Sequence, residues 1–201
     1  MGDAVSFLKA KAAEFPPGYS YDWQSDSRQY VQEGSALIFA FLFALIAIYL
    51  VLSVQYNSFT DPVIILVSVP LSVFGALIPL ALGVTTLNIY TEIGLITLIG
   101  LVSKHGILMV EFANEILHRD NVDRRTAIET AAAIRFRPII MTTAAMVVGL
   151  APLVIATGAG ANSRFGLGTV IVVGMIVGTS MTLFVLPSVY TVIRPRRGKT
   201  V

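Results

Sequence analysis

The sequence predicts an all-α polytopic membrane protein, with five transmembrane helices and a short periplasmic α/β segment at its N-terminus. Three observations support this fold class: 55% of the 201 residues are hydrophobic, only 13% are charged, and the mean hydropathy is +0.79. Such values lie outside the usual range of soluble domains. They are typical of a chain that crosses the bilayer several times.

Five apolar stretches account for the predicted spans, at residues 36–54, 63–82, 93–110, 138–155 and 167–192. At a rise of about 1.5 Å per residue, a helix of this length crosses the hydrocarbon core of about 30 Å. The last stretch is longer than needed, so part of it is expected to protrude or tilt.

Small residues and prolines within these stretches predict how the helices pack. Gly174 and Gly178 form a Gly-x-x-x-Gly pattern, which allows close helix approach. Pro70, Pro152 and Pro187 lie inside apolar stretches and predict kinks.

The distribution of basic residues predicts the orientation. The segment 111–137 holds five arginines and the segment 194–201 holds three arginines and a lysine, whereas the loop 83–92 holds none. Positively charged segments stay in the cytoplasm, so both basic segments are expected there. Five spans then place residues 1–35 in the periplasm of a Gram-negative cell, and the chain in its inner membrane.

Three regions follow from this layout. Residues 1–35 are expected to be the incomplete end of a periplasmic subdomain: Phe7 and Leu8 share a helical stripe, residues 16–18 (Pro-Pro-Gly) stop the helix, and residues 19–23 alternate like a strand. One helix and one strand cannot enclose a core, so the rest of that subdomain must come from elsewhere. The other regions are the five-span region 36–193 and the basic cytoplasmic tail 194–201.

A short helix is expected after Asp123, which is a plausible N-cap residue. Ala127, Ile128 and Ala131 give this segment an apolar stripe. Two interpretations remain open, a helix on the membrane surface and a solvated linker helix packed on neighbouring loops.

Lys104 is the only Lys, Arg, Asp or Glu in the stretch 93–110. A charged residue inside a membrane helix costs about 2.5–3.5 kcal/mol on insertion scales, so it persists mainly beside a polar partner or a water-filled path. Lys104 therefore predicts an ion or proton pathway. The alternative is that its long side chain extends to the interface.

Thr142 and Thr143 are the candidate partners of Lys104. Counted from the cytoplasmic edge, the lysine lies roughly 10 Å deep on the third span and the threonines roughly 8 Å deep on the fourth. The alternative is that each threonine bonds only the carbonyl four residues earlier. Arg135 could guide protons at the cytoplasmic mouth, or serve only as a topology anchor. His105 points about 100° away from Lys104, so it is expected to face a neighbouring helix.

Several residue types are missing from the five stretches. They contain no Asp or Glu, so the carboxylates that a proton relay needs must lie on helices outside this chain. The chain has no cysteine and only two histidines, which argues against a thiol nucleophile or a metal cluster. No enzymatic activity, cofactor or nucleic-acid partner is expected.

The residues 100–113 (GLVSKHGILMVEFA), followed by 135–143 (RFRPIIMTT), resemble the C-terminal half of resistance-nodulation-division (RND) efflux pumps. The similarity continues through Pro152-Leu153, residues 158–161 and the last span, and covers nearly the whole chain. It is closer to the hydrophobe and amphiphile (multidrug) branch than to the heavy-metal branch. His105 departs from the asparagine that is common after the lysine.

This resemblance implies a fold, a function and partners. The five spans would be the eighth to twelfth of a roughly twelve-span transporter built from two parallel halves. The family exports amphiphilic or hydrophobic compounds by drug:proton antiport. It works as a trimer in membrane lipid, with a periplasmic adaptor and an outer-membrane channel. Lys104 would match the relay lysine, Thr142 the relay threonine and Arg135 the arginine on the cytoplasmic proton route.

The resemblance also implies missing parts. The paired aspartates of the fourth span and most of the porter domain have no counterpart in this sequence. The chain is therefore expected to be a truncated C-terminal part that cannot pump without the rest of the transporter. The alternative is a non-transporting membrane or assembly subunit that pairs with a separately encoded first half.

Overall fold

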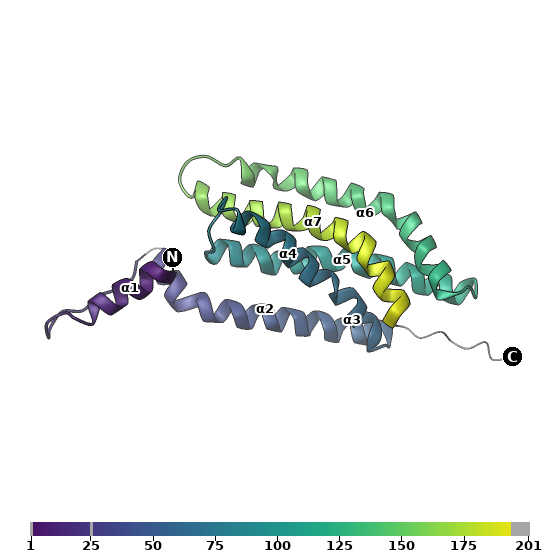
Figure 1. Ribbon diagram of the computed structural model, residues 1–201, viewed down its shortest axis with the longest axis horizontal. Helices are drawn as coiled ribbons and strands as arrows, with labels where there is room; N and C mark the ends of the chain where they lie inside the picture. Colours follow the sequence, from purple (N-terminus) through teal and green to yellow (C-terminus); the bar gives the residue numbers. More distant parts are fainter. Residues whose placement is uncertain (1, 25, 194–201) are drawn as a thin grey trace.

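The computed structural model describes residues 2–24 and 26–193, and every regular element in those ranges is a helix (Figure 1). The helices are α1 (Gly2–Ala12), α2 (Asp26–Tyr56), α3 (Thr60–Leu66), α4 (Ser68–Ala81), α5 (Ile89–Arg119), α6 (Arg124–Val154) and α7 (Ala161–Ile193). Five segments, with α3 and α4 counted as one, are long and apolar enough to cross a membrane. The prediction of five spans is confirmed.

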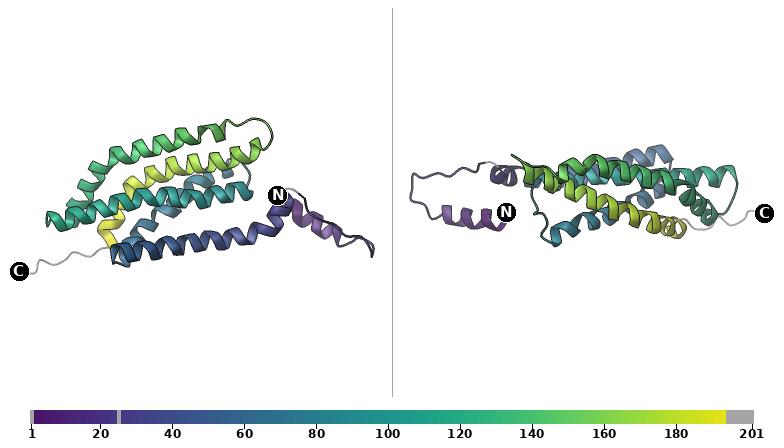
Figure 2. Two further views of the ribbon diagram at one scale, coloured as in Figure 1. Left: turned by 180° about the vertical axis from the view of Figure 1, so that it is seen from behind. Right: turned by 90° about the horizontal axis from the view of Figure 1, so that it is seen from above.

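Helix α7 lies at the centre of the bundle, because it packs against α4, α5 and α6. Helix α2 packs mainly against α3 and α5, and it diverges from the other long helices toward α1 (Figures 1 and 2). Only 6% of the apolar window of α2, and 6% of that of α6, is buried inside the protein. Both helices therefore offer apolar surface to lipid or to further protein.

The second span is divided at Val67, between α3 and α4. Pro70 explains this position, because a proline ring clashes with the carbonyl four residues earlier, and that residue is Leu66, where α3 ends. The kink predicted at Pro70 is thus present as an interruption of one residue, Val67, whose backbone stays in the helical region. Helices α6 and α7 continue through Pro152 and Pro187, and α7 bends toward its C-terminal end (Figure 1).

Helices α4 and α7 approach closely, as the glycine pattern predicts. A Cβ atom on Gly178 would lie 2.6 Å from the Cβ of Ser72, and one on Gly75 would lie 2.7 Å from the Cβ of Val177. Real Cβ atoms do not come this close to other atoms, so only glycine permits this contact.

The N-terminal segment differs from its prediction. Helix α1 forms, but the strand expected at residues 19–23 does not, and no strand is present in residues 2–24 and 26–193. A single extended segment with no second strand to pair with leaves its backbone groups to solvent. The boundary expected at residue 35 falls inside α2, and the tail 194–201 lies outside the described residues.

The helix expected after Asp123 forms, but it is not a separate element. Asp123 is the N-cap of α6, which runs without interruption to Val154. Ala127, Ile128 and Ala131 are buried in the core shared with α5 and α7. Both interpretations of this segment are therefore wrong: the apolar stripe covers neither lipid nor a solvated loop, but packs inside the bundle.

Candidate functional site

Helix α5 has a buried face and an exposed stripe. The buried face packs against the rest of the bundle and includes Leu98, Val102, His105 and Met109. The exposed residues follow one stripe at intervals of three, four or seven positions: Ile93, Thr97, Gly100, Lys104, Glu111 and Glu115. The stripe includes Lys104 and two glutamates, whereas His105 lies on the buried face.

Lys104 lies in the middle of the exposed stripe. Its ammonium makes no hydrogen bond or ion pair with residues 2–24 and 26–193. Thr142, its expected partner, donates its hydroxyl hydrogen to the carbonyl oxygen of Pro138 at 2.7 Å. This is the bond to the carbonyl four residues earlier that the sequence analysis considered as the alternative. The described residues contain no direct bond between Lys104 and Thr142, and their joint role in a relay stays a prediction.

The helix register nevertheless places Lys104 and Thr142 at the same level. Helices α5 and α6 run antiparallel, joined by the loop 120–123 (Figure 1). The guanidinium carbon of Arg135 on α6 lies 4.4 Å from the ring centroid of Phe112 on α5. Thr142 lies seven residues after Arg135 on α6, and His105, the neighbour of Lys104, lies seven residues before Phe112 on α5. Because the helices run antiparallel, both steps lead from the Arg135–Phe112 contact to the same level of the bundle.

Arg135 is held against α5 by this ring contact. A cation over an aromatic face contributes about 0.5–1 kcal/mol when exposed and about 2 when desolvated. The Nε of Arg135 is buried and has no hydrogen-bond partner among the described residues. Arg135 and Thr142 are seven residues apart, two helical turns, so both lie on the face of α6 that meets α5.

His105 faces α7, in line with the expectation that it faces a neighbouring helix. Its ring is buried, and Nδ1 lies 3.2 Å from the hydroxyl oxygen of Thr179. The Thr143 hydroxyl donates its hydrogen mainly to the carbonyl oxygen of Ile139 at 2.9 Å, and it also lies 3.5 Å from the Thr179 hydroxyl oxygen, a longer contact. A chain of polar groups thus joins α5, α7 and α6. The sequence did not identify Thr179, because nothing in an apolar stretch reveals which neighbour a threonine faces.

A second buried network lies between α3, α5 and α7. The amide of Asn114 donates to the carboxylate of Asp61 at 3.1 Å and its carbonyl accepts from the Tyr190 hydroxyl at 2.7 Å. Asp61 and Tyr190 are both buried, at 1% and 0% exposure. The sequence reasoning missed this network, because the sequence does not reveal that Asn114 lies between Asp61 and Tyr190.

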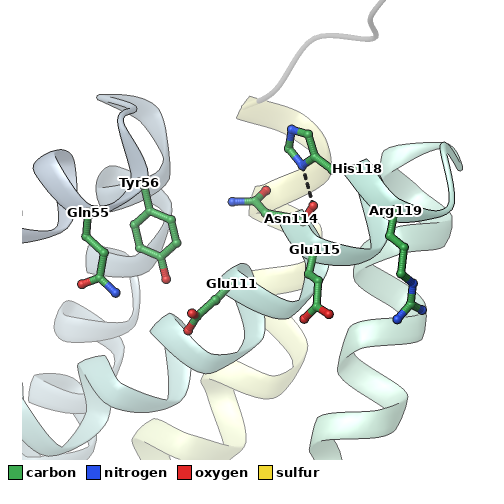
Figure 3. Close-up of a pocket in the computed structure, with 7 residues that line it drawn as sticks. All are labelled: Gln55, Tyr56, Glu111, Asn114, Glu115, His118 and Arg119. Atoms are coloured by element: carbon green, nitrogen blue, oxygen red, sulfur yellow. Dashed lines mark hydrogen bonds between the residues drawn. The ribbon is translucent and has the colours of Figure 1, made fainter.

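The same end of the bundle contains a hollow of about 620 Å³ between α2 and α5 (Figure 3). The Tyr56 hydroxyl donates to the carbonyl oxygen of Ile107 at 3.3 Å and closes one side of it. The lining residues are Gln55, Tyr56, Glu111, Asn114, Glu115, His118 and Arg119. No group of His, Cys, Asp or Glu in the described part of the chain is arranged to hold a metal ion.

The bonds that Arg119 donates to Asp120 in the adjoining loop hold the pKa of that carboxyl below its usual range.

Five membrane-length helices, one of which carries an exposed lysine, define a polytopic membrane protein. The family model described as AcrB/AcrD/AcrF matches residues 1–194. The chain therefore belongs to the AcrB-like RND permease family.

Individual relatives agree with this assignment. The chain is 53% identical over 197 residues to an uncharacterized transporter of Haemophilus influenzae, covering 94% of this chain and 19% of the relative. It is 37% identical over 186 residues to the toluene efflux pump membrane transporter TtgB of Pseudomonas putida, covering 92% and 18%. It is 34% identical over 192 residues to the multidrug resistance protein MdtF of Escherichia coli, covering 96% and 18%. The chain thus spans about a fifth of the length of these relatives.

Proposed function

We propose that this chain is the C-terminal part of a proton-driven efflux transporter, which exports amphiphilic or hydrophobic compounds by drug:proton antiport. Lys104, Thr142 and Arg135 form its half of the proton relay. The carboxylates that exchange protons with Lys104 come from spans of the other half, so these five spans do not pump by themselves.

One observation carries the proposal: the charged lysine of a membrane-length helix is exposed, at the level of Thr142, in a member of the RND family. An exposed ammonium in a membrane is costly unless another protein surface or water covers it. A second set of spans facing this stripe, with acidic groups opposite Lys104, would remove that cost. The toluene efflux named for TtgB and the multidrug resistance named for MdtF support the same function.

The proposal also covers the location and the partners of the chain. The chain lies in the inner membrane, with residues 1–35 in the periplasm and the C-terminus in the cytoplasm. In the complete pump it joins the rest of the transporter, forms a trimer, and meets a periplasmic adaptor and an outer-membrane channel. It acts as a transporter and not as an enzyme.

The test replaces the matching segment of the TtgB transporter with residues 1–194 of this chain, in a Pseudomonas putida strain that lacks its own pump. The parent graft should restore toluene tolerance. Lys104→Ala should reduce tolerance to the level of the pump-deficient strain, because the ammonium that alternates with the carboxylates is gone. Thr142→Val should reduce tolerance, and Thr142→Ser, which keeps the hydroxyl, should retain it.

Lys9→Ala is the matched control, because Lys9 is exposed in α1 and lies outside the spans. It should leave tolerance unchanged. Full tolerance of Lys104→Ala, at equal abundance in the membrane, would reject the relay role of Lys104. A parent graft that is present in the membrane but restores no tolerance would favour the alternative of a non-transporting assembly subunit.

A further inference from the structure

The buried chain His105–Thr179–Thr143 joins three helices at one level of the bundle. His105 is 1% exposed, Thr179 4% and Thr143 9%. The Nδ1 of His105 lies 3.2 Å from the Thr179 hydroxyl oxygen, and the Thr143 hydroxyl lies 3.5 Å from that same oxygen. Its members come from α5, α7 and α6, so Thr179 is the link between the two outer helices.

Each outer member of this chain is the sequence neighbour of a proposed relay residue. His105 follows Lys104 on α5, and Thr143 follows Thr142 on α6. Adjacent residues on a helix point about 100° apart. When His105 and Thr143 point inward to Thr179, the rotation of each helix directs Lys104 and Thr142 toward the open side.

We infer that Thr179, with His105 and Thr143, is a positioning group that fixes the rotation of α5 and α6 and so aligns Lys104 with Thr142. This inference rests on the proposed relay function of those two residues. None of the three positioning residues exchanges protons with substrate or carboxylates; they act through their neighbours.

Lipid-embedded helices have little hydrophobic force to hold their mutual rotation, so interhelical hydrogen bonds have a disproportionate role. On the buried sides of α5 and α6, most other side chains are aliphatic, such as Leu98, Val102 and Ile139, and aliphatic contacts are not directional. The polar chain favours one rotation, because His105 and Thr179 would otherwise lose their bond to each other inside the bundle.

The first test measures the geometry directly. The chain has no cysteine, so Lys104→Cys and Thr142→Cys give two unique sites for nitroxide labels. Distances between the labels are measured by pulsed electron spin resonance on the full chain in lipid bilayers. Thr179→Val, which keeps the side-chain shape and removes the hydroxyl, should lower the population of the main distance about threefold, equivalent to about 0.6 kcal/mol, the average for hydrogen bonds between membrane helices.

Thr179→Ser is the matched control, since it keeps the hydroxyl and should retain the parent distribution. His105→Leu and His105→Asn form a second pair, in case Thr179→Val does not insert. An asparagine amide reaches about the position of the imidazole Nδ1, so His105→Asn should behave like the parent and His105→Leu like Thr179→Val. Equal distributions in parent, Thr179→Val and His105→Leu would overturn the inference.

The second test observes the hydrogen bond itself. The chain has two histidines, so His118→Gln leaves His105 as the only imidazole. Solid-state ¹⁵N spectra of the labelled ring should show a shift of the Nδ1 resonance in Thr179→Val and none in Thr179→Ser. An Nδ1 resonance that does not respond to loss of the Thr179 hydroxyl would contradict the contact on which the inference depends.

Transport by the grafted pump separates the two proposals. Thr179→Val should lower the maximal export rate without changing the substrate concentration at half-maximal rate, and Thr179→Ser should restore it. If Lys104→Ala leaves export intact, the relay is rejected, but the label distances and the Nδ1 resonance still decide whether Thr179 aligns the helices. Unchanged maximal export in Thr179→Val, in a pump that needs Lys104, would reject the positioning role.

Discussion

At the scale of single residues, buried polar groups and exposed polar groups have separate tasks in this protein. Each of the two buried networks joins three helices, through Thr179 in one case and Asn114 in the other. Lys104 lies on the exposed stripe of α5 and makes no such bond to the described residues. The buried groups hold the helices in place, and the exposed lysine is available to groups on other spans.

The relative level of Lys104 and Thr142 along the bundle could be predicted from the sequence, but the direction of their side chains could not. Counting residues from the membrane edge placed Lys104 and Thr142 at similar depths, and the Arg135–Phe112 contact agrees with that register. Which side of the helix each one faces depends on packing with neighbouring helices. The sequence therefore gave no reason to select Thr179, or to expect Asn114 between a carboxylate and a phenol.

Tyr190→Phe tests the network around Asn114. The substitution removes the hydroxyl that donates to Asn114 at 2.7 Å, and leaves a buried amide carbonyl short of a donor. We expect the free energy of unfolding to fall by about 1 kcal/mol, the usual effect of one hydrogen bond. Reversible unfolding of the chain in mixed micelles, followed by circular dichroism, measures this change.

Tyr49→Phe is the matched control for that experiment. Tyr49 is half-buried on α2, and its hydroxyl makes no hydrogen bond within the described residues. Its loss should leave the free energy of unfolding nearly unchanged. If both substitutions have equal effects, the Tyr190 hydroxyl does not stabilise the bundle through Asn114.

At the scale of helices, apolar length predicted the spans well because a bilayer leaves few alternatives to helices. Predictions that depended on a few residues were less accurate than the prediction of the spans. The stripe at Ala127, Ile128 and Ala131 indicated a separate amphipathic helix, but the structure continues it into α6 through Pro138. The strand expected at residues 19–23 failed because it has no partner among the described residues.

The close packing of α4 on α7 makes Gly178→Ala destabilising. Its new Cβ would lie 2.6 Å from the Ser72 Cβ and 2.8 Å from the Ser72 Cα, so the backbone of α4 would have to move. Overpacking of this kind costs about 1–3 kcal/mol. Unfolding in mixed micelles should show a loss of that size.

Gly149→Ala provides the contrast within α6. A Cβ at Gly149 meets no atom within 4 Å, and alanine is favoured over glycine inside a helix by about 0.5–1 kcal/mol. This substitution should leave the free energy of unfolding unchanged or raise it. A loss in both variants would point to a general effect of glycine removal and against the α4–α7 contact as its cause.

At the scale of the whole molecule, the loops fall at two opposite ends of the bundle. The loops 57–59 and 120–123 lie at one end, and the loops 82–88 and 155–160 lie at the other (Figure 1). The arginines that begin α6 and end α5, Arg119, Arg124 and Arg125, are all at the first end. Among the loops of the bundle, Arg164 at the start of α7 is at the opposite end. The excess of arginine at the first end predicts that this end faces the cytoplasm.

Labelling of single cysteines in this naturally cysteine-free chain tests that orientation. Asp123 and Ala159 are exposed loop residues at opposite ends of the bundle, so Asp123→Cys and Ala159→Cys differ only in the side they report. In intact spheroplasts, a membrane-impermeant maleimide should label Ala159→Cys and should reach Asp123→Cys only after lysis. The reason is that the energy of carrying several arginines across the bilayer opposes the reverse insertion. Labelling of Asp123→Cys before lysis would place the basic end in the periplasm, and the cytoplasmic mouth proposed for Arg135 would then lie on the wrong side of the membrane.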